Sequence, residues 1–214
     1  MSKSAFATHM DSRMDLYLLR HGRSVANERN LVCGASDYPL SATGFRQAET
    51  ICQHLRPIGF TRIYCSPLSR ARDTIASLSD VAPISIDPLL AELDTGDVSH
   101  ITLSELWTRD PRYQTPWLTA DLAYPGGERF ADMFERIKAW YSLKSKEWNN
   151  DEIVLVVGHE GTLRSIYSYL MDLQLKDYPS FPIGNCNYFY FKIINGKVHH
   201  HTLVAVPSID GAEP

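Results

Sequence analysis

Two apolar runs that each lead to a histidine constrain the fold of this chain more than any other feature. Residues 14–19 are mainly apolar and lead to His21, and the unbroken apolar run 153–157 leads to His159. Such runs are typical of strands that are covered on both faces, as in a parallel sheet. Because ligands of open α/β sheets bind at the carboxyl ends of the strands, we expect both histidines at one functional edge.

Helix and strand patterns alternate along the rest of the chain. We expect a helix from 41–44 to 57–59, helices over 68–78, 129–148 and 162–171, and strands over 62–65, 84–86, 188–194 and 198–206. The last two strands are joined at Asn195-Gly196, a favoured hairpin turn. Residues 25–37 are polar and read as a loop. The sequence predicts an α/β fold, a three-layer sandwich with a mostly parallel central sheet flanked by helices.

The segment 89–128 departs from this alternation, with recurring prolines and little periodicity. We interpret it as a small inserted cap that contains one helix around 102–109. Its aromatic residues are core or pocket-wall candidates: Trp107, Tyr113, Trp117 and Tyr124. A single domain is therefore expected over 14–206, with 1–13 as a flexible or cloning-derived segment and 207–214 as a loose C-terminus.

Composition excludes several classes of protein. The chain has 21 Lys and Arg against 25 Asp and Glu, a formal net charge of −4, without the basic surplus of a nucleic-acid binder. No stretch approaches the roughly 20 apolar residues of a membrane helix. The four cysteines are scattered and no secretion signal is evident, so we expect reduced thiols and a cytoplasmic location. The oligomeric state stays open, a dimer included.

The surroundings of His21 suit chemistry on a phosphate. This imidazole lies between Arg20 and Arg23, a strongly positive place. Phosphate monoesters hydrolyse extremely slowly without a catalyst, and enzymes accelerate the reaction mainly by stabilising the charge on the phosphoryl oxygens. Such a site needs a nucleophile, several fixed donors around those oxygens, and an acid for the departing alkoxide.

The sequence supplies a candidate for each role. A neutral imidazole at His21 can attack phosphorus and form a phosphohistidine. The ordinary pKa of histidine, about 6.5, leaves much of it neutral at physiological pH, and a backbone carbonyl is needed to fix its tautomer. The guanidinium forks of Arg20 and Arg70 match phosphate oxygens in pairs. The other candidates are His159 and Asn27 as phosphate donors and Glu92 as the acid.

Five segments, in order, resemble the motifs of the histidine phosphatase superfamily, the phosphoglycerate-mutase-like enzymes. They are Arg20-His21-Gly22 with Asn27, the segment 37–44, Ser66-Pro67-Leu68-Ser69-Arg70-Ala71, Glu92-Leu93-Asp94-Thr95-Gly96 and Val157-Gly158-His159-Glu160-Gly161. The resemblance implies that His21 is the phosphorylated nucleophile and Glu92 the acid. It implies a phosphate pocket of Arg20, Arg70 and His159 with Asn27 as an auxiliary contact. It implies no metal and no cofactor.

The segment after Glu92 favours a phosphatase over a mutase. The family's cofactor-dependent mutases follow this acid with Arg-His-Tyr-Gly, whereas this chain has Leu-Asp-Thr-Gly and a cap that looks short. We therefore expect a metal-independent phosphatase acting on a phosphate ester of a small metabolite. The alternatives are a phosphoglycerate-type phosphomutase, a protein phosphatase and a non-catalytic phospho-ligand binder.

Several residues keep two interpretations. Asp94 and Asp97 are nearby carboxylates that can assist or replace Glu92, and Arg23 and Ser24 belong either to the site or to loop packing. Three further arginines also have two interpretations, either contact with an acidic substrate or exposure to water: Arg109, Arg112 and Arg129. Alternation along a strand sends adjacent residues to opposite faces, so the run 199–201 of three histidines is not expected to bind a metal.

Overall fold

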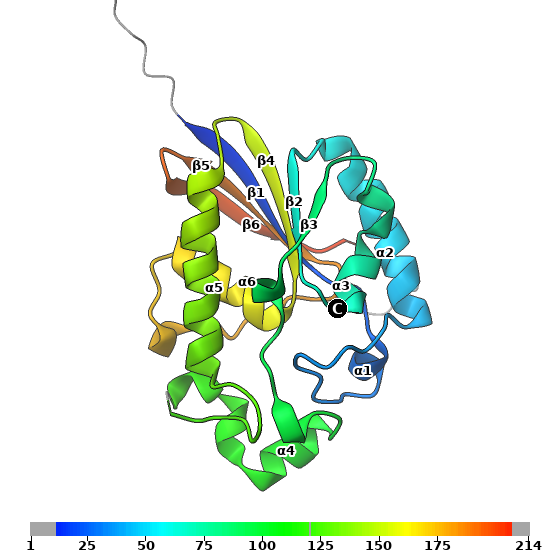
Figure 1. Ribbon diagram of the computed structural model, residues 1–214, viewed down its shortest axis with the longest axis vertical. Helices are drawn as coiled ribbons and strands as arrows, with labels where there is room; N and C mark the ends of the chain where they lie inside the picture. The colour runs from blue at the N-terminus through cyan, green and yellow to red at the C-terminus, as the bar shows by residue number, and fades with distance from the viewer. Residues whose placement is uncertain (1–11, 120, 207–214) are drawn as a thin grey trace, which may run out of the picture.

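The computed structural model describes residues 12–119 and 121–206, which form one six-stranded mixed sheet with helices on both faces (Figure 1). The strands are β1 (Arg13–Arg20), β2 (Arg62–Cys65), β3 (Ile84–Ile86), β4 (Glu152–Gly158), β5 (Tyr188–Ile194) and β6 (Lys197–Val204). Their order across the sheet is β3-β2-β4-β1-β5-β6. The predictions for residues 1–11 and 207–214 lie outside the described part, and Arg13 already belongs to β1.

The first four strands in this order are parallel to one another, whereas β5 is antiparallel to β1 and β6 is antiparallel to β5. The predicted hairpin between β5 and β6 is confirmed. Asn195 and Gly196 have φ values of 52° and 72°. Both residues are in the left-handed region that a two-residue hairpin turn of this kind requires. The mostly parallel sheet therefore ends in an antiparallel ribbon.

In the described part of the chain, six α-helices accompany the sheet: α1 (Val25–Glu28), α2 (Ala42–Leu55), α3 (Ser69–Thr74), α4 (Leu103–Arg109), α5 (Phe130–Lys144) and α6 (Glu160–Leu170). The 3-10 segments are Arg56–Ile58, Ala76–Leu78, Pro88–Leu90, Gly96–Val98, Pro111–Gln114, Pro116–Leu118, Ser145–Glu147 and Leu175–Asp177. In Figure 1, α5 and α6 lie on one side of the sheet and α2 and α3 on the other. The expected three-layer sandwich is confirmed.

The alternation of side chains along β4 explains why its sequence is apolar throughout. Val154 and Val156 join one core cluster with the buried residues of α5 and α6. Leu155 and Val157 join a second cluster with the buried residues of α2 and α3. A strand between two helical layers has no solvent-facing side, so both sets of alternating positions are apolar.

Some element boundaries differ from the predictions. Residues 25–37 contain the short helix α1, whose Ser24 and Asn27 cap each other reciprocally, a local arrangement that the polar composition hid. The helix predicted over 68–78 ends as an α-helix at Thr74 and continues as 3-10 turns. The helix predicted over 129–148 becomes 3-10 after Lys144. The apolar face predicted for α5 is confirmed by the buried residues Phe130, Met133, Phe134, Ile137, Trp140 and Tyr141.

Residues of the segment 89–128 lie beyond the carboxyl ends of β1 and β4, at the lower end of Figure 1. The helix predicted around 102–109 is present as α4, with Thr102 as its N-cap. Leu106 and Tyr124 are buried in the same cluster as the α5 face. This packing holds the segment over the edge of the sheet where the two histidine turns emerge.

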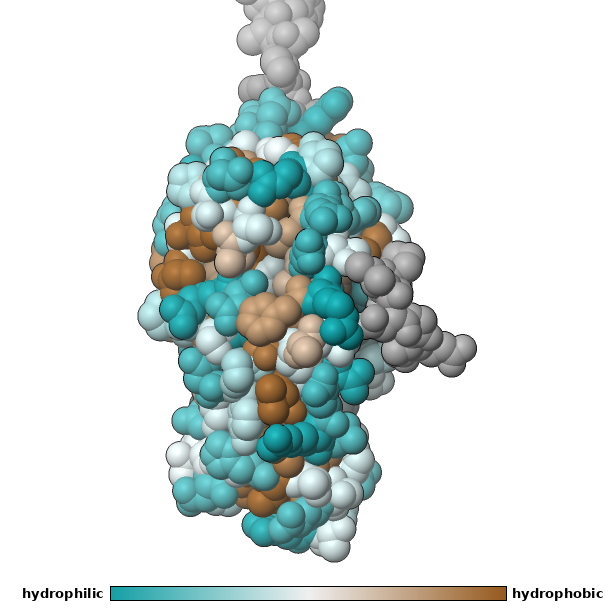
Figure 2. Space-filling view, turned by 90° about the vertical axis from the view of Figure 1, so that its right-hand side faces the viewer, coloured by the Kyte–Doolittle hydropathy of each residue, from teal (hydrophilic) through white to brown (hydrophobic). Residues whose placement is uncertain are grey.

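The surface is mixed in character. On the face shown in Figure 2, hydrophobic residues are interspersed among hydrophilic ones. Within the described ranges, no helix is both long and apolar enough to cross a membrane.

Candidate active site

The two histidine turns meet at one edge of the sheet, as the sequence predicts. β1 and β4 are parallel neighbours, and Arg20 pairs with Gly158 at their ends. The His21 amide donates to the Gly158 carbonyl oxygen at 3.1 Å. The ring centroids of His21 and His159 are 5.0 Å apart. The parallel register of β1 and β4 therefore determines the spacing of the two imidazoles.

His21 is buried, with 4% of its surface exposed, and its ring is fixed by its own turn. Nδ1 lies 2.7 Å from the Gly22 carbonyl oxygen. Since a carbonyl can only accept, Nδ1 carries the hydrogen and Nε2 keeps a lone pair. Burial, together with the charges of Arg70 and Arg20, lowers the pKa of His21 well below its usual value. The neutral form needed for nucleophilic attack is thus favoured near pH 7.

His159 is the N-cap residue of α6 and is 1% exposed. Its Nε2 lies 2.7 Å from the Ser66 hydroxyl oxygen. Its Nδ1 is buried without a hydrogen-bond partner. Burial, Arg70 and His21 lower the pKa of His159 well below its usual value. Because the Ser66 hydroxyl can donate to Nε2, Nδ1 can carry the ring hydrogen and donate it to a ligand.

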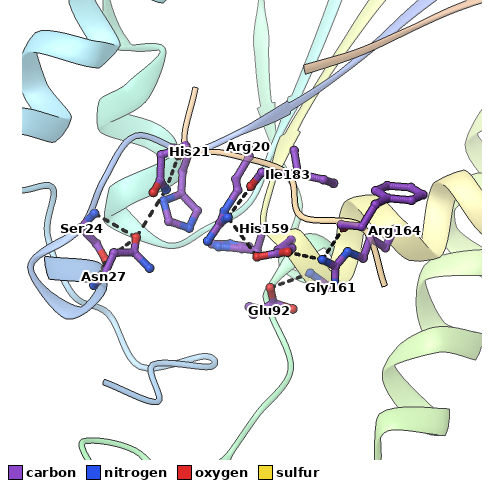
Figure 3. A network of polar contacts seen from close by, with 12 residues as sticks. Arg20, His21, Ser24, Asn27, Glu92, His159, Gly161, Arg164 and Ile183 are labelled. Carbon is purple, nitrogen blue, oxygen red and sulfur yellow. Dashed lines mark hydrogen bonds and ion pairs between the residues drawn. The ribbon is translucent and has the colours of Figure 1, made fainter. Parts of the chain in front are cut away.

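Arg20 and Arg70 approach the histidines from two different elements, β1 and α3. Some nitrogens of each guanidinium group already bind oxygen atoms of the protein. Arg20 Nη1 is 2.9 Å from a carboxylate oxygen of Glu160 and also donates to the Ile183 carbonyl (Figure 3). Arg20 Nε is buried and unpartnered. Arg70, 2% exposed, donates to the carbonyls of Gly34 and Ser36, both at 2.7 Å. Each predicted fork is therefore oriented by the protein itself.

Asn27 combines the two interpretations that the sequence allowed. Its Oδ1 accepts from the amide and the hydroxyl of Ser24, both at 3.0 Å, which closes the first turn of α1 (Figure 3). Asn27 and Ser24 also line the cavity in front of His21. Since Oδ1 is used in the cap, the amide Nδ2 is the group that Asn27 can offer to a ligand.

Glu92 is the carboxylate that the fold brings to the site. Its Oε2 accepts from the Gly161 amide at 3.0 Å, and its Oε1 from the Leu93 amide at 2.9 Å. A Cβ at Gly161 would lie 2.5 Å from Glu92 Oε1, so this approach requires a glycine. Asp94 and Asp97 are exposed and do not line the cavity, and Asp94 accepts from the Gly96 amide instead.

A cavity of about 290 Å³ joins these groups. Its lining includes all six predicted site residues: Arg20, His21, Asn27, Arg70, Glu92 and His159. Arg23 does not line it, and its amide donates to Gln47. A buried polar atom without a partner is costly, so the free Arg20 Nε and His159 Nδ1 beside this cavity fit an anionic ligand.

Sequence reasoning missed a second layer of charge on α6. Glu160 bridges two arginines, because its carboxylate pairs with both Arg20 and Arg164. Arg164 also donates to the Phe181 carbonyl, its Nε is buried without a partner, and it lines the cavity. The i, i+4 spacing of Glu160 and Arg164 was the available signal for this pair. Ser66 belongs to the predicted motif 66–71, but its hydrogen bond to His159 was not predicted from the sequence.

The cap candidates separate into two groups. Tyr113 and Tyr124 line the cavity, whereas Trp107 and Trp117 do not. The three uncommitted arginines form surface ion pairs, Arg109 with Glu105, Arg112 with Asp110 and Arg129 with Asp132. Among residues 12–119 and 121–206, no cluster of histidine, cysteine or carboxylate side chains has the arrangement of a metal site.

Comparison with known proteins agrees with this geometry. Residues 16–205 match the family described as the histidine phosphatase superfamily (branch 1). The chain belongs to this superfamily. Phosphoserine phosphatase 1 of Hydrogenobacter thermophilus is similar to this chain. The two sequences are 28% identical over an alignment that covers 81% of this chain and 83% of the phosphatase. The adenosylcobalamin/alpha-ribazole phosphatase of Escherichia coli is 32% identical to this chain over an alignment that covers 75% of this chain and 80% of that phosphatase.

Mutase-named proteins are also similar to this superfamily member. The probable phosphoglycerate mutase GpmB of Enterobacter sp. is 28% identical over 81% of this chain and 82% of its own length. Among solved structures, Bacillus stearothermophilus YhfR has a TM-score of 0.75 at 28% identity, covering 87% of this chain and 94% of that one. The relatives thus include small-metabolite phosphatases and probable mutases.

Proposed function

We propose that this chain is a metal-independent phosphatase that hydrolyses a phosphate monoester of a small metabolite through a phosphohistidine on His21. The observation that carries the proposal is the setting of His21, which is buried and held in one tautomer by the Gly22 carbonyl, with its pKa lowered by burial and by Arg70 and Arg20. Its Nε2 is left with a lone pair beside a cavity that has unpartnered donors. This is the arrangement that an attacking imidazole needs.

In the first step, Nε2 of His21 attacks phosphorus as the bond to the leaving oxygen breaks. Glu92 gives its proton to that oxygen, which leaves as an alcohol. Arg20, Arg70 and His159 stabilise the charge on the phosphoryl oxygens, and Asn27 adds a neutral donor. Fixed donors of this kind lose no reorganisation energy when the charge develops. The charge stabilisation that many phosphatases obtain from metals is supplied here by arginines.

In the second step, water attacks the phosphohistidine. The Glu92 carboxylate accepts the water proton, the phosphorus–nitrogen bond breaks, and its electron pair returns to Nε2. Inorganic phosphate leaves, and His21 is again neutral with Nδ1–H on the Gly22 carbonyl. The two steps restore every proton to its starting place, so no cofactor is required.

A phosphomutase is the second candidate, because GpmB-named relatives are as similar to this chain as the phosphatase-named ones. The same phosphohistidine would then transfer its phosphoryl group to a second hydroxyl instead of to water. An acidic mutase substrate needs cations beyond the phosphate pocket. The cap arginines of the described chain are paired at the surface, which supports hydrolysis over transfer.

The test is hydrolysis of 4-nitrophenyl phosphate in the presence of a chelator. We expect turnover by the natural protein and its complete loss in His21→Ala, with full activity in the matched control His200→Ala on β6, which is exposed. Rapid quenching in base followed by mass spectrometry detects the phosphohistidine. Retained activity in His21→Ala refutes the proposal. Phosphate transfer between positions of phosphoglycerate that exceeds phosphate release favours the mutase.

A further inference from the structure

The cavity has two chemically different ends. Most charged residues of its lining come from β1, α3 and α6, at the carboxyl edge of the sheet, whereas the lining from the cap is mainly apolar. The apolar part includes Leu31, Leu103, Leu106, Tyr113, Tyr124 and Phe130. They come from the loop after α1, from the cap and from the first turn of α5. Since the phosphoryl group must meet the charged end, the leaving group of the ester faces this apolar part.

Three arginines of the cap and of the residue that follows it point away from the cavity. Arg109, Arg112 and Arg129 have half-exposed side chains and pair with carboxylates at the surface. None of the three lines the cavity. The side chains of the cap that do line it, apart from Glu92, are uncharged. A second anionic group on the substrate that reached the cap would therefore meet no cation from the described residues of the cap.

The charges at the other end match one phosphate. Three arginines, Arg20, Arg70 and Arg164, line the cavity together with two carboxylates, Glu92 and Glu160. Glu160 is paired with two of these arginines, Arg20 and Arg164. Three arginines against two carboxylates leave a formal excess of one positive charge, which a single phosphate dianion already offsets. Because an unpaired buried charge is costly, a further carboxylate or phosphate on the substrate is disfavoured.

The lining of the apolar part and the volume of the cavity suit a small aromatic group. The rings of Tyr113 and Tyr124 lie 4.6 Å apart, and the Tyr113 hydroxyl is already bonded to the Ala123 carbonyl. The two rings are tilted by 39° and both line the cavity, so an aromatic ring of the substrate can pack against them in an offset or edge-on arrangement. The cavity volume of about 290 Å³ is just below the roughly 300–1,000 Å³ range of small-molecule pockets.

We propose that the substrate is the phosphate monoester of an uncharged, apolar alcohol or phenol of about one ring in size, and that esters with a second anionic group are rejected. The inference rests on the proposed function and narrows its substrate class. Apolar burial at the cap and the absence of a compensating cation there act in the same direction, because both favour the neutral leaving group.

The test compares two nearly isosteric esters, 4-carbamoylphenyl phosphate and 4-carboxyphenyl phosphate, which differ in the charge of the ring substituent. We expect kcat/KM to be at least tenfold higher for the carbamoyl ester at pH 7.5. Equal values, or a preference for the carboxylate, overturn the inference. If both esters are hydrolysed with dependence on His21, the proposed function stands whatever their ratio. If neither is hydrolysed, the proposed function and the inference fail together.

A pair of leucine variants localises the effect. Leu103 lines the cavity and is 39% exposed, so Leu103→Arg adds a cation at the leaving-group end without burying it. Leu118 lies in the same cap, is 63% exposed and does not line the cavity, which makes Leu118→Arg the matched control. We expect Leu103→Arg to reduce the carbamoyl-to-carboxyl ratio at least threefold and Leu118→Arg to leave it unchanged. Equal ratios in both variants contradict the assigned leaving-group end.

Discussion

Replacing Gly161 by alanine tests the role of Glu92 without touching Glu92 itself. The new Cβ would lie 2.5 Å from Glu92 Oε1, where ordinary contact begins near 3.4 Å. The carboxyl group must therefore move by about 0.9 Å, and a displacement of about 1 Å in a reacting group costs about 10²-fold in rate. The carboxyl is the far end of a flexible side chain, so the fold accommodates the change.

The expected result is a selective loss of catalysis. We expect kcat/KM to fall about 10²-fold, equivalent to about 2.7 kcal/mol of barrier, for an ester of an alkyl alcohol. The loss should be much smaller for 4-nitrophenyl phosphate, because a phenolate that leaves easily needs little help from an acid. The free energy of unfolding should be unchanged or higher by up to ~1 kcal/mol, because alanine is a better helix former than glycine.

The assay is steady-state hydrolysis of both esters, with urea unfolding as the measure of stability. The matched comparison is Glu92→Gln, alone and combined with Gly161→Ala. If alanine acts through Glu92, the double variant is no slower than Glu92→Gln, because coupled substitutions are not additive. Equal losses on the two esters, or additive losses in the double variant, refute the argument.

Three further predictions follow from the buried charges. In phosphate-free buffer, the free energy of unfolding should fall below about pH 6.5 by up to ~2.7 kcal/mol per pH unit, because the unfolded chain takes up protons that folded His21 and His159 do not. This slope should be halved in His21→Ala. Arg70→Lys should lose the contacts to the carbonyls of Gly34 and Ser36. We expect the free energy of unfolding in urea titrations to fall by about 1–3 kcal/mol and kcat/KM to fall as well. If neither quantity changes, Arg70 is not oriented by these carbonyls. Glu160→Gln should raise the affinity for inorganic phosphate as a competitive inhibitor, because Arg20 loses its paired carboxylate, and a weaker inhibition contradicts this.

The sequence by itself determined the layers and the meeting place of the main candidates. The unbroken apolar run of β4 and the amphipathic face of α5 are local patterns, and both occur where predicted. Parallel strands place their carboxyl ends at one edge, so His21 and His159 had to meet once β1 and β4 were recognised. What the sequence could not give were boundaries such as that of α1, whose capping depends on individual side-chain bonds.

The tertiary structure alone decided how those candidates are arranged. Glu92, rather than Asp94 or Asp97, reaches the cavity because Gly161, 69 residues away, has no side chain in the way and its amide donates to the Glu92 carboxylate. The linkage of Arg20 to Arg164 through Glu160 and the apolar lining contributed by the cap also join segments far apart along the chain. Local sequence patterns encode strands, helices and reactive residue types, whereas the charge balance and shape of a cavity depend on contacts that exist only after the chain has folded.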